Sequence, residues 1–295
     1  MIRFILAIIL TLAFCVSDCF ALNLRPYMQT PPEVQVFAKR VIEDGGKIID
    51  LEYCQKYTRL SKQLIIWSNG KFVGDANMGV KKDAANAVSK LYDLSGNNND
   101  ATSGVTVNNQ PVWTAGVQGG RAGLVFDGND DNLTGSDANF PLGDTPRHEL
   151  LVMKLDTVAK TFHEFTSYGE FSNTHGFLFS SDGLGKSDKI LIGYYSFNSG
   201  NFGTLTTDTQ IVEMGQESSA VAIYLYLNGT GASVSLPGTP CDTIAGGAAG
   251  FRIGYGWNAS YLDGVLFTNT IFNTALTTAQ RTATEAFLNA YYSIY

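Results

Sequence analysis

Apolar and polar residues alternate with a period of two through much of the chain beyond residue 88. The clearest case is 220–236, where apolar residues recur at every second position on both sides of Asn228-Gly229. Asn-Gly is strongly preferred in two-residue hairpin turns, because both central positions need positive φ. The pattern predicts a β-hairpin over 220–236.

Turn signals of the same kind divide residues 88–134 into short strands. Asp93-Leu94-Ser95-Gly96 and three asparagines follow an apolar pair, and such residues bond their own backbone and tolerate left-handed conformations. Further along, the β-type run 124–126 ends at Asp127-Gly128. This stretch therefore predicts strands that are joined by tight polar turns.

Helical periodicity is confined to the two ends of the chain. Near the N-terminus, Thr30 as the cap, proline at the first helical position (Pro31) and Glu33 three residues after the cap predict a helix that ends at Gly45-Gly46. A second helix is predicted over 50–64. At the other end, 277–280 reads as a capping box ahead of a final helix with apolar residues at helical spacing. We expect that helix to pack on the strands and close the domain.

The order of these segments resembles the concanavalin A-like lectin/glucanase superfamily, specifically its laminin-G-like jelly rolls. The resemblance covers roughly residues 80–295, and the segments that carry it are 92–102, 110–113, 123–134, 224–233 and 251–292. It implies an all-β, antiparallel two-sheet jelly-roll sandwich with a small N-terminal helical segment and a C-terminal helix. The 31 glycines and only 16% charged residues suit many short strands.

The first 21 residues have the pattern of a secretory signal peptide. Arg3 precedes an apolar run over 4–16, and small or polar residues lead to Ala21. An uncut run of this kind is a membrane anchor, but it is short for a span of about 20 residues. We therefore expect a secreted, extracellular protein without stable membrane insertion after cleavage. The predicted organisation is 1–21 signal peptide, 22–84 helical segment docked on the sandwich, and 85–295 jelly roll.

Cleavage after Ala21 leaves two cysteines, Cys54 and Cys241, in a compartment that permits disulfides. A disulfide between them and two separate buried thiols both fit the sequence.

The net charge of the predicted sandwich excludes one class of partner. Residues 91–295 carry 8 Lys/Arg against 19 Asp/Glu. That balance repels phosphate, so no nucleic-acid partner is expected.

Catalytic motifs are missing from the sequence. Related glucanases use an E-x-D-x-x-E run, whose alternation points its carboxylates into one cleft. Here Glu164 and Glu170 have the wrong spacing, and the acids over 127–131 lie in a predicted turn. The three histidines are scattered and form no metal-ligand pair. These observations predict that the protein is not an enzyme and needs no cofactor.

Calcium is the one ion for which the sequence offers ligands. Asp127, Asn129 and Asp131 alternate oxygen-bearing side chains as in a calcium loop, although the glutamate at the twelfth position of an EF-hand is replaced by Ala138. Laminin-G-like domains often bind calcium at loop aspartates, which the resemblance carries over to these positions. The alternative is a polar turn that caps its own backbone.

A glycan site is predicted at Tyr255, Trp257, Asn258 and Tyr261. The stretch is aromatic, bears an amide and is flanked by glycine, so an exposed ring can stack on a sugar while the amide meets its hydroxyls. The alternative is that Trp257 packs in the core.

The leading functional hypothesis is a non-catalytic carbohydrate-binding or adhesion module, secreted or on a virion surface, whose partner is a glycan or cell-surface polysaccharide. Its rival is a phage structural protein (tail, fibre or head decoration) that binds no sugar and contacts other virion subunits, since 79–102 is similar to segments of such proteins. A glycoside hydrolase-like enzyme is disfavoured because the expected carboxylates are missing.

Overall fold

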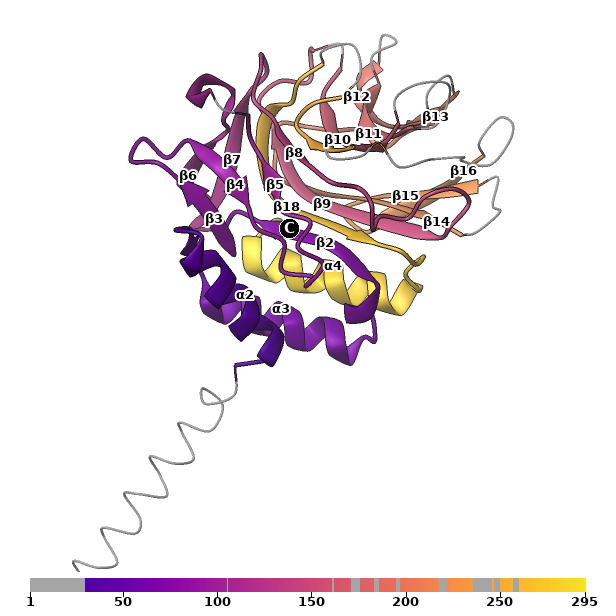
Figure 1. The fold of residues 1–295 in the computed structure, drawn as a ribbon. Coiled ribbons are helices and arrows are strands. Elements are labelled where there is room, and N and C mark those ends of the chain that lie inside the picture. Colours follow the sequence, from indigo (N-terminus) through magenta and orange to yellow (C-terminus); the bar gives the residue numbers. More distant parts are fainter. Residues whose placement is uncertain are drawn as a thin grey trace, which may run out of the picture.

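The structure is a computed structural model that describes residues 30–104, 106–160, 162–170, 176–182, 186–194, 197–217, 222–235, 246, 250–256 and 260–295. Two antiparallel sheets face each other as a sandwich, and three helices lie outside it (Figure 1). The predicted fold class, an all-β two-sheet sandwich with N-terminal helices and a C-terminal helix, is confirmed. The predicted signal peptide and Cys241 lie outside the described residues.

The larger sheet has ten strands. In spatial order they are β1 (Lys47–Ile48), β3 (Gly79–Lys82), β4 (Val88–Leu91), β5 (Ala101–Thr102), β8 (Leu133–Gly135), β17 (Phe251–Ile253), β10 (Glu164–Gly169), β11 (Gly176–Asp182), β12 (Lys186–Tyr194) and β13 (Phe197–Phe202).

The second sheet has eight strands. In spatial order they are β16 (Thr230–Ser235), β15 (Ala222–Leu227), β14 (Gln210–Gln216), β9 (Arg147–Leu155), β18 (Asp263–Phe272), β7 (Arg121–Asp127) and β6 (Val112–Gln118), and β2 (Gly70–Asp75) pairs with β18 beside that path. The turn of the β15–β16 hairpin has φ of 48° at Asn228 and 77° at Gly229, so the predicted hairpin is confirmed.

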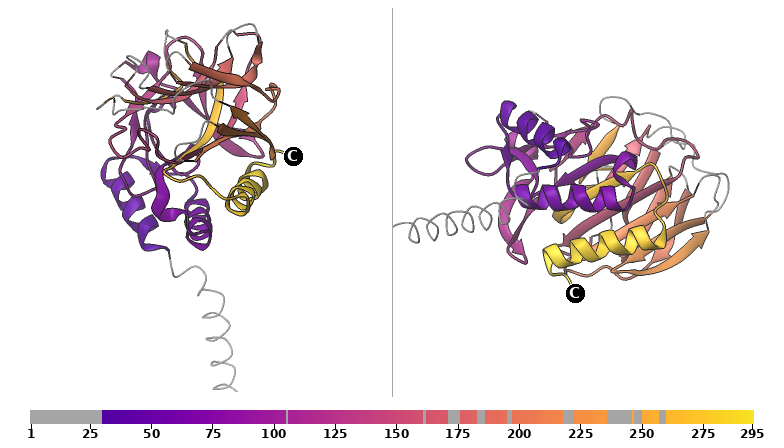
Figure 2. Two further views of the ribbon diagram at one scale, coloured as in Figure 1. Left: turned by 90° about the vertical axis from the view of Figure 1, so that its right-hand side faces the viewer. Right: turned by 90° about the horizontal axis from the view of Figure 1, so that it is seen from below.

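The helices α3 (Leu51–Gln63) and α4 (Thr278–Tyr292) lie against the outer face of the eight-stranded sheet, and α2 (Pro32–Glu43) packs beside α3 against β1 and β3 of the larger sheet (Figure 2). Along β9, Leu151 and Met153 point into the sandwich, whereas Leu150 and Val152 point toward the helices. Both faces of this strand are therefore buried, which accounts for the consecutive apolar residues from Leu150 to Met153.

The helix ends follow the capping signals in part. Thr277 and Gln280 form the predicted capping box of α4. The predicted Thr30 cap of α2 is wrong, because Pro31 is the N-cap and no side chain caps the helix. Pro32, at the first helical position, already has its φ fixed near the helical value, so the helix begins without a polar cap.

The strands before residue 85 belong to the sandwich. β2 pairs with β18, and β3 pairs with β4, so residues 70–82 contribute to both sheets. The division into a helical segment over 22–84 and a jelly roll over 85–295 stays a prediction. Among the described residues, no helix has the length and apolar character needed to span a membrane.

Candidate functional site

The predicted calcium loop lies at one end of the sandwich, where β7 leads into β8. Asp127 ends β7 and pairs with Asp263, the first residue of β18. The loop is held by its own side chains: Asp127 Oδ1 accepts from the backbone N–H of Asn129 at 2.9 Å, and Asp131 Oδ2 accepts from that of Asp127 at 2.9 Å. Gly128 supplies the positive φ, 75°, that this turn requires.

Three carboxylates converge in this loop. One oxygen from each of Asp127, Asp130 and Asp131 lies within 4.8 Å of the others. The Asn129 amide nitrogen donates to the Asp127 carboxylate at 3.1 Å, so this side chain orients Asp127. The sequence-based ligand set contained Asn129 but not Asp130, because strict alternation skips the even position.

The carboxylates differ in their readiness to lose a proton. Burial, together with the charges of Asp127 and Asp130, raises the pKa of Asp131 to about 6, although the hydrogen bond from the backbone of Asp127 acts to lower it. Burial also acts to raise the pKa of Asp127, but hydrogen bonds from Asn129 and from the backbone of Asp130 outweigh it and hold that pKa below its usual value. At mildly acidic pH, Asp127 is ionised while Asp131 keeps a substantial protonated fraction.

The predicted glycan-binding loop lies beside these carboxylates. Tyr255 and Tyr261 form an isolated antiparallel bridge, and their half-buried rings stack with centroids 5.0 Å apart. Burial raises the pKa of Tyr261, with smaller contributions from Tyr255 and Asp130. Trp257 and Asn258, the other two predicted contacts, lie outside the described residues.

Lys160 links the two loops. Its ammonium donates to the carbonyl of Gly128 at 2.6 Å and to the carbonyl of Tyr261 at 2.8 Å. Burial lowers the pKa of Lys160, while the charges of Asp263 and Asp127 act in the opposite direction. Sequence reasoning missed this residue, since it is remote in sequence from Tyr261. We call Asp127, Asp130, Asp131, Lys160, Tyr255 and Tyr261 the aspartate–tyrosine site.

Beneath this site lie two buried ionisable side chains. His163 Nδ1 accepts from the backbone N–H of Asp263 at 3.3 Å, and burial lowers its pKa to about 4, so the ring is neutral at pH 7. Glu164 packs under Gly256, where an added Cβ would lie 2.2 Å from the Glu164 carboxyl carbon. Glycine at 256 is therefore needed for the tyrosine loop to approach β10 this closely.

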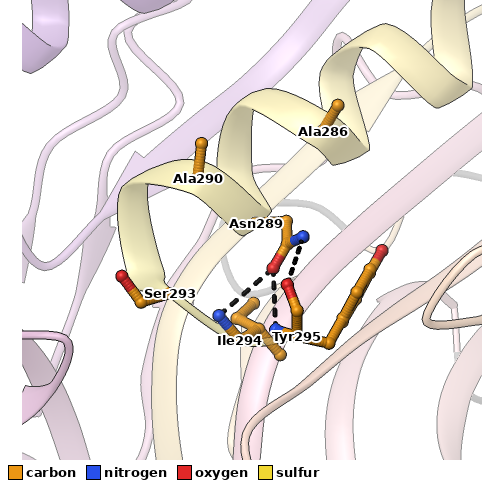
Figure 3. A pocket seen from close by; sticks show the side chains of 6 residues that line it. All are labelled: Ala286, Asn289, Ala290, Ser293, Ile294 and Tyr295. Carbon is orange, nitrogen blue, oxygen red and sulfur yellow. Dashed lines mark hydrogen bonds between the residues drawn. The ribbon is translucent and has the colours of Figure 1, made fainter.

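A cavity of about 480 Å³ lies at the end of α4, and the polar side chain of Asn289 that lines it is already hydrogen-bonded within the chain (Figure 3). Asn289 Oδ1 accepts from the backbone N–H groups of Ile294 and Tyr295 at 3.1 and 2.9 Å. Its amide nitrogen donates to the Tyr295 carbonyl at 2.9 Å. These bonds fix the last turn of the chain, and no carboxylate, histidine or lysine lines the cavity.

Comparisons with known proteins find similarity in structure only. No protein-family model matches the sequence, and no curated protein matches it. Domain 4 of AbnA, a GH43 extracellular arabinanase from Geobacillus stearothermophilus, is similar over 74% of this chain and 98% of its own, with TM-score 0.53 and 17% identity. A GH54 α-L-arabinofuranosidase is similar over 79% of this chain and 65% of its own, with TM-score 0.54 and 10% identity.

The ligand-binding domain of botulinum neurotoxin serotype D is similar over 75% of this chain and 52% of its own, with TM-score 0.51 and 12% identity. It was solved with N-acetylneuraminic acid, and the arabinanase domain with arabinotriose. The chain therefore has a β-sandwich of the kind found in glycoside hydrolases and sugar-binding domains, which is consistent with glycan binding. At these identities the likeness establishes the fold alone.

These neighbours overturn two expectations from the sequence, that the chain is a non-catalytic module and that it is not an enzyme. The arabinanase domain and the arabinofuranosidase both come from glycoside hydrolases, so the comparisons indicate the fold of a carbohydrate-active enzyme. The error came from requiring an E-x-D-x-x-E run. That run gathers carboxylates along one strand, whereas tertiary structure can gather them from a loop, as it does at Asp127 and Asp131.

Proposed function

We propose that this protein is a carbohydrate-active enzyme that hydrolyses a glycosidic bond at the aspartate–tyrosine site. The observation that carries the proposal is the pairing of Asp127 and Asp131, whose carboxylate oxygens lie within 4.8 Å and whose pKa values are shifted in opposite directions. Two carboxylates with separated pKa values are what general acid and nucleophile require in glycoside hydrolysis.

Each carboxylate has a distinct role in this mechanism. Asp131, with its pKa raised to about 6, protonates the leaving-group oxygen. Asp127, kept ionised by hydrogen bonds from Asn129, attacks the anomeric carbon or stabilises positive charge on it. Carboxyl oxygens within 4.8 Å leave no room for a water molecule between acid and base, which favours retention of anomeric configuration through a glycosyl–Asp127 ester. Asp131, ionised after the first step, then takes a proton from the water that hydrolyses this ester and frees Asp127.

The neighbouring side chains supply substrate binding. The stacked Tyr255 and Tyr261 offer aromatic surface to the apolar face of a sugar. Lys160 holds the tyrosine loop against the carboxylates through its two carbonyl contacts. Trp257 and Asn258, which lie outside the described residues, stay in the proposal as glycan contacts predicted from the sequence alone.

The family and the location of the protein are part of the proposal. A laminin-G-like jelly roll of the concanavalin A-like superfamily accounts for the order of the sequence segments. The signal-peptide pattern over 1–21 supports secretion, and an extracellular glycan or cell-surface polysaccharide is then the substrate.

Calcium is the second candidate occupant of this site, favoured by the three clustered carboxylates. Calcium takes six to eight oxygen ligands, and Asp127, Asp130 and Asp131 would supply the protein carboxylates among them. Calcium binding would keep Asp131 ionised and remove the proposed acid. A thermal melt with 1 mM calcium chloride or with EDTA distinguishes the catalytic role from the ion site. An unchanged melting midpoint supports the catalytic role, and a large rise of the midpoint with calcium supports the ion site.

The test of hydrolysis is release of reducing sugar from arabinan, xylan, galactan and cell-wall polysaccharide. Asp131→Asn and Asp127→Asn are each expected to lower the rate by a factor of about 100 or more. Asp144→Asn is the matched control. Asp144 is exposed on the loop before β9, whereas the aspartate–tyrosine site lies near the other end of that strand. Absence of release from every substrate, or equal rates in all three variants, would reject the proposal.

A further inference from the structure

A second cavity, of about 270 Å³, lies on the outer face of the eight-stranded sheet, where α4 begins. His148 on β9, Gly215 on β14 and Tyr224 on β15 are neighbours across three strands, because His148 pairs with Gly215 and Gly215 with Tyr224. Thr277 and Thr278 close the cavity from the start of α4.

This cavity is far from the aspartate–tyrosine site. His148 is near the start of β9, whereas Leu155, at its end, pairs with Gly264 beside that site. Seven residues of extended chain separate the two positions along the strand, or about 23 Å. The cavity is therefore a distinct place on the molecule.

The floor of the cavity is a histidine with a fixed orientation. His148 is only 2% exposed, and its Nε2 lies 3.0 Å from Glu213 Oε2, which is itself fully buried. With Nε2 engaged by the Glu213 carboxylate, the ring presents its other nitrogen, Nδ1, toward the cavity. None of the described residues donates a hydrogen bond to Nδ1.

Glycine at position 215 keeps the space in front of this nitrogen open. A Cβ added there would lie 3.0 Å from His148 Nδ1 and would occupy the position of a ligand atom. A strand interior ordinarily disfavours glycine, and close approach by another group is one of the reasons for finding it there. The group that approaches Gly215 is the His148 imidazole, and glycine there leaves Nδ1 uncovered toward the cavity.

The rim of the cavity adds an acceptor and an aromatic face. Glu217 is exposed, and Tyr224 is 38% exposed, so its ring is available for stacking. The nearby cation, Arg281, is already engaged: its guanidinium lies 4.0 Å from the Tyr226 ring centroid and bonds Glu285 at 2.9 Å. The cavity thus offers the His148 ring nitrogen, a carboxylate acceptor and a ring face, with negative rather than positive charge at its rim.

We propose that this cavity is a second glycan-binding site, which takes one unit of a neutral saccharide. His148 Nδ1 forms a hydrogen bond with one sugar hydroxyl, the Glu217 carboxylate accepts a hydrogen bond from another, and the Tyr224 ring stacks on the apolar face of the sugar. Drug-sized ligands occupy pockets of roughly 300–1,000 Å³, so a cavity of this size suits a single sugar ring. The negative rim disfavours acidic sugars.

This proposal goes beyond hydrolysis, and its test is independent of whether the protein hydrolyses a glycan. Binding is measured by ligand-observed NMR titration with arabinotriose, xylotriose and cellotriose on the Asp127→Asn/Asp131→Asn/Tyr255→Ala variant, which removes both the proposed chemistry and the proposed stacking surface of the first site. At least one trisaccharide is expected to bind. On this background, Tyr224→Ala and Gly215→Ala are each expected to weaken binding roughly tenfold. Tyr295→Ala, a change at an exposed aromatic residue outside both proposed sites, is the matched control and is expected to leave this binding unchanged.

Thermal melts of all variants exclude unfolding as the cause. Because Tyr224 is on the surface, its replacement by alanine is expected to leave the melting midpoint nearly unchanged. If none of the three trisaccharides binds at millimolar concentration, the proposal is overturned. Equal affinity in the parent, Tyr224→Ala and Gly215→Ala proteins would overturn it as well, whether or not hydrolysis is found.

Discussion

The hydroxyl of Tyr292 donates a hydrogen bond of 2.6 Å to Asp75 Oδ2, and so ties the end of α4 to the end of β2. Tyr53 of α3 donates to the same oxygen at 2.9 Å, and the backbone N–H of Asn77 donates to Oδ1 at 2.7 Å. One fully buried carboxylate thereby joins two helices to the sheet. Burial raises its pKa to about 6, although these hydrogen bonds act to lower it.

Tyr292→Phe is expected to lower the free energy of unfolding by about 1–3 kcal/mol, because it removes a donor from a buried carboxylate and leaves the ring packing in place. Chemical denaturation at pH 7 measures the change. Tyr224→Phe removes a hydroxyl from an exposed ring and is expected to change stability by less than about 0.5 kcal/mol. Equal effects of the two substitutions would show that the Asp75 contact contributes nothing.

Glu149 predicts a pH dependence of stability. It is buried inside the sandwich, where the Thr166 hydroxyl donates to it, and burial raises its pKa to about 8. The folded protein then binds a proton that the unfolded chain releases above about pH 4.5. The stability that this proton supplies is fully present below about pH 4.5 and is lost as pH rises through about 8.

Glu149→Gln is expected to flatten the fall in melting midpoint between pH 6 and 8, because the amide does not ionise. The window excludes most of the titration of Asp75, whose pKa is raised only to about 6. Glu217→Gln, at an exposed position, is the matched control and is expected to keep the parental slope. A parental slope in Glu149→Gln would contradict the assignment.

The proposed mechanism predicts a descending pH–rate profile. Asp131 must be protonated to act as the acid, so kcat/KM is expected to fall about tenfold per pH unit above about pH 6. The profile is measured with the substrate identified by reducing-sugar release. Activity that is flat from pH 5 to 8 would exclude Asp131 as the general acid.

Gly256→Ala tests the packing under the tyrosine loop. The added methyl group would collide with the Glu164 carboxyl, and such overpacking costs about 1–3 kcal/mol. Gly104→Ala, where an added Cβ meets nothing within 4 Å, is expected to change stability by no more than about 0.5 kcal/mol. A stable Gly256→Ala protein would show that the loop can move away from β10 without cost.

The candidate site was only partly predictable. Asp127, Asp131, Tyr255 and Tyr261 stand out in the sequence because their stretches combine turn residues with polar or aromatic side chains. That these two stretches form one site was not predictable, because Lys160, which bonds both, comes from a third segment. No sequence motif marks the cavity at His148, because its polar residues come from separate strands.

Local patterns by themselves determined the sandwich class, the β15–β16 hairpin and the capped helix α4, because alternation, positive-φ turns and capping boxes act within a few residues of chain. The tertiary structure decided that β2 and β3 join the sheets, and that α3 and α4 meet at Asp75. It also decided which carboxylates share a loop and which are buried enough to change their pKa, because burial and charge proximity arise only when segments distant in the sequence pack together.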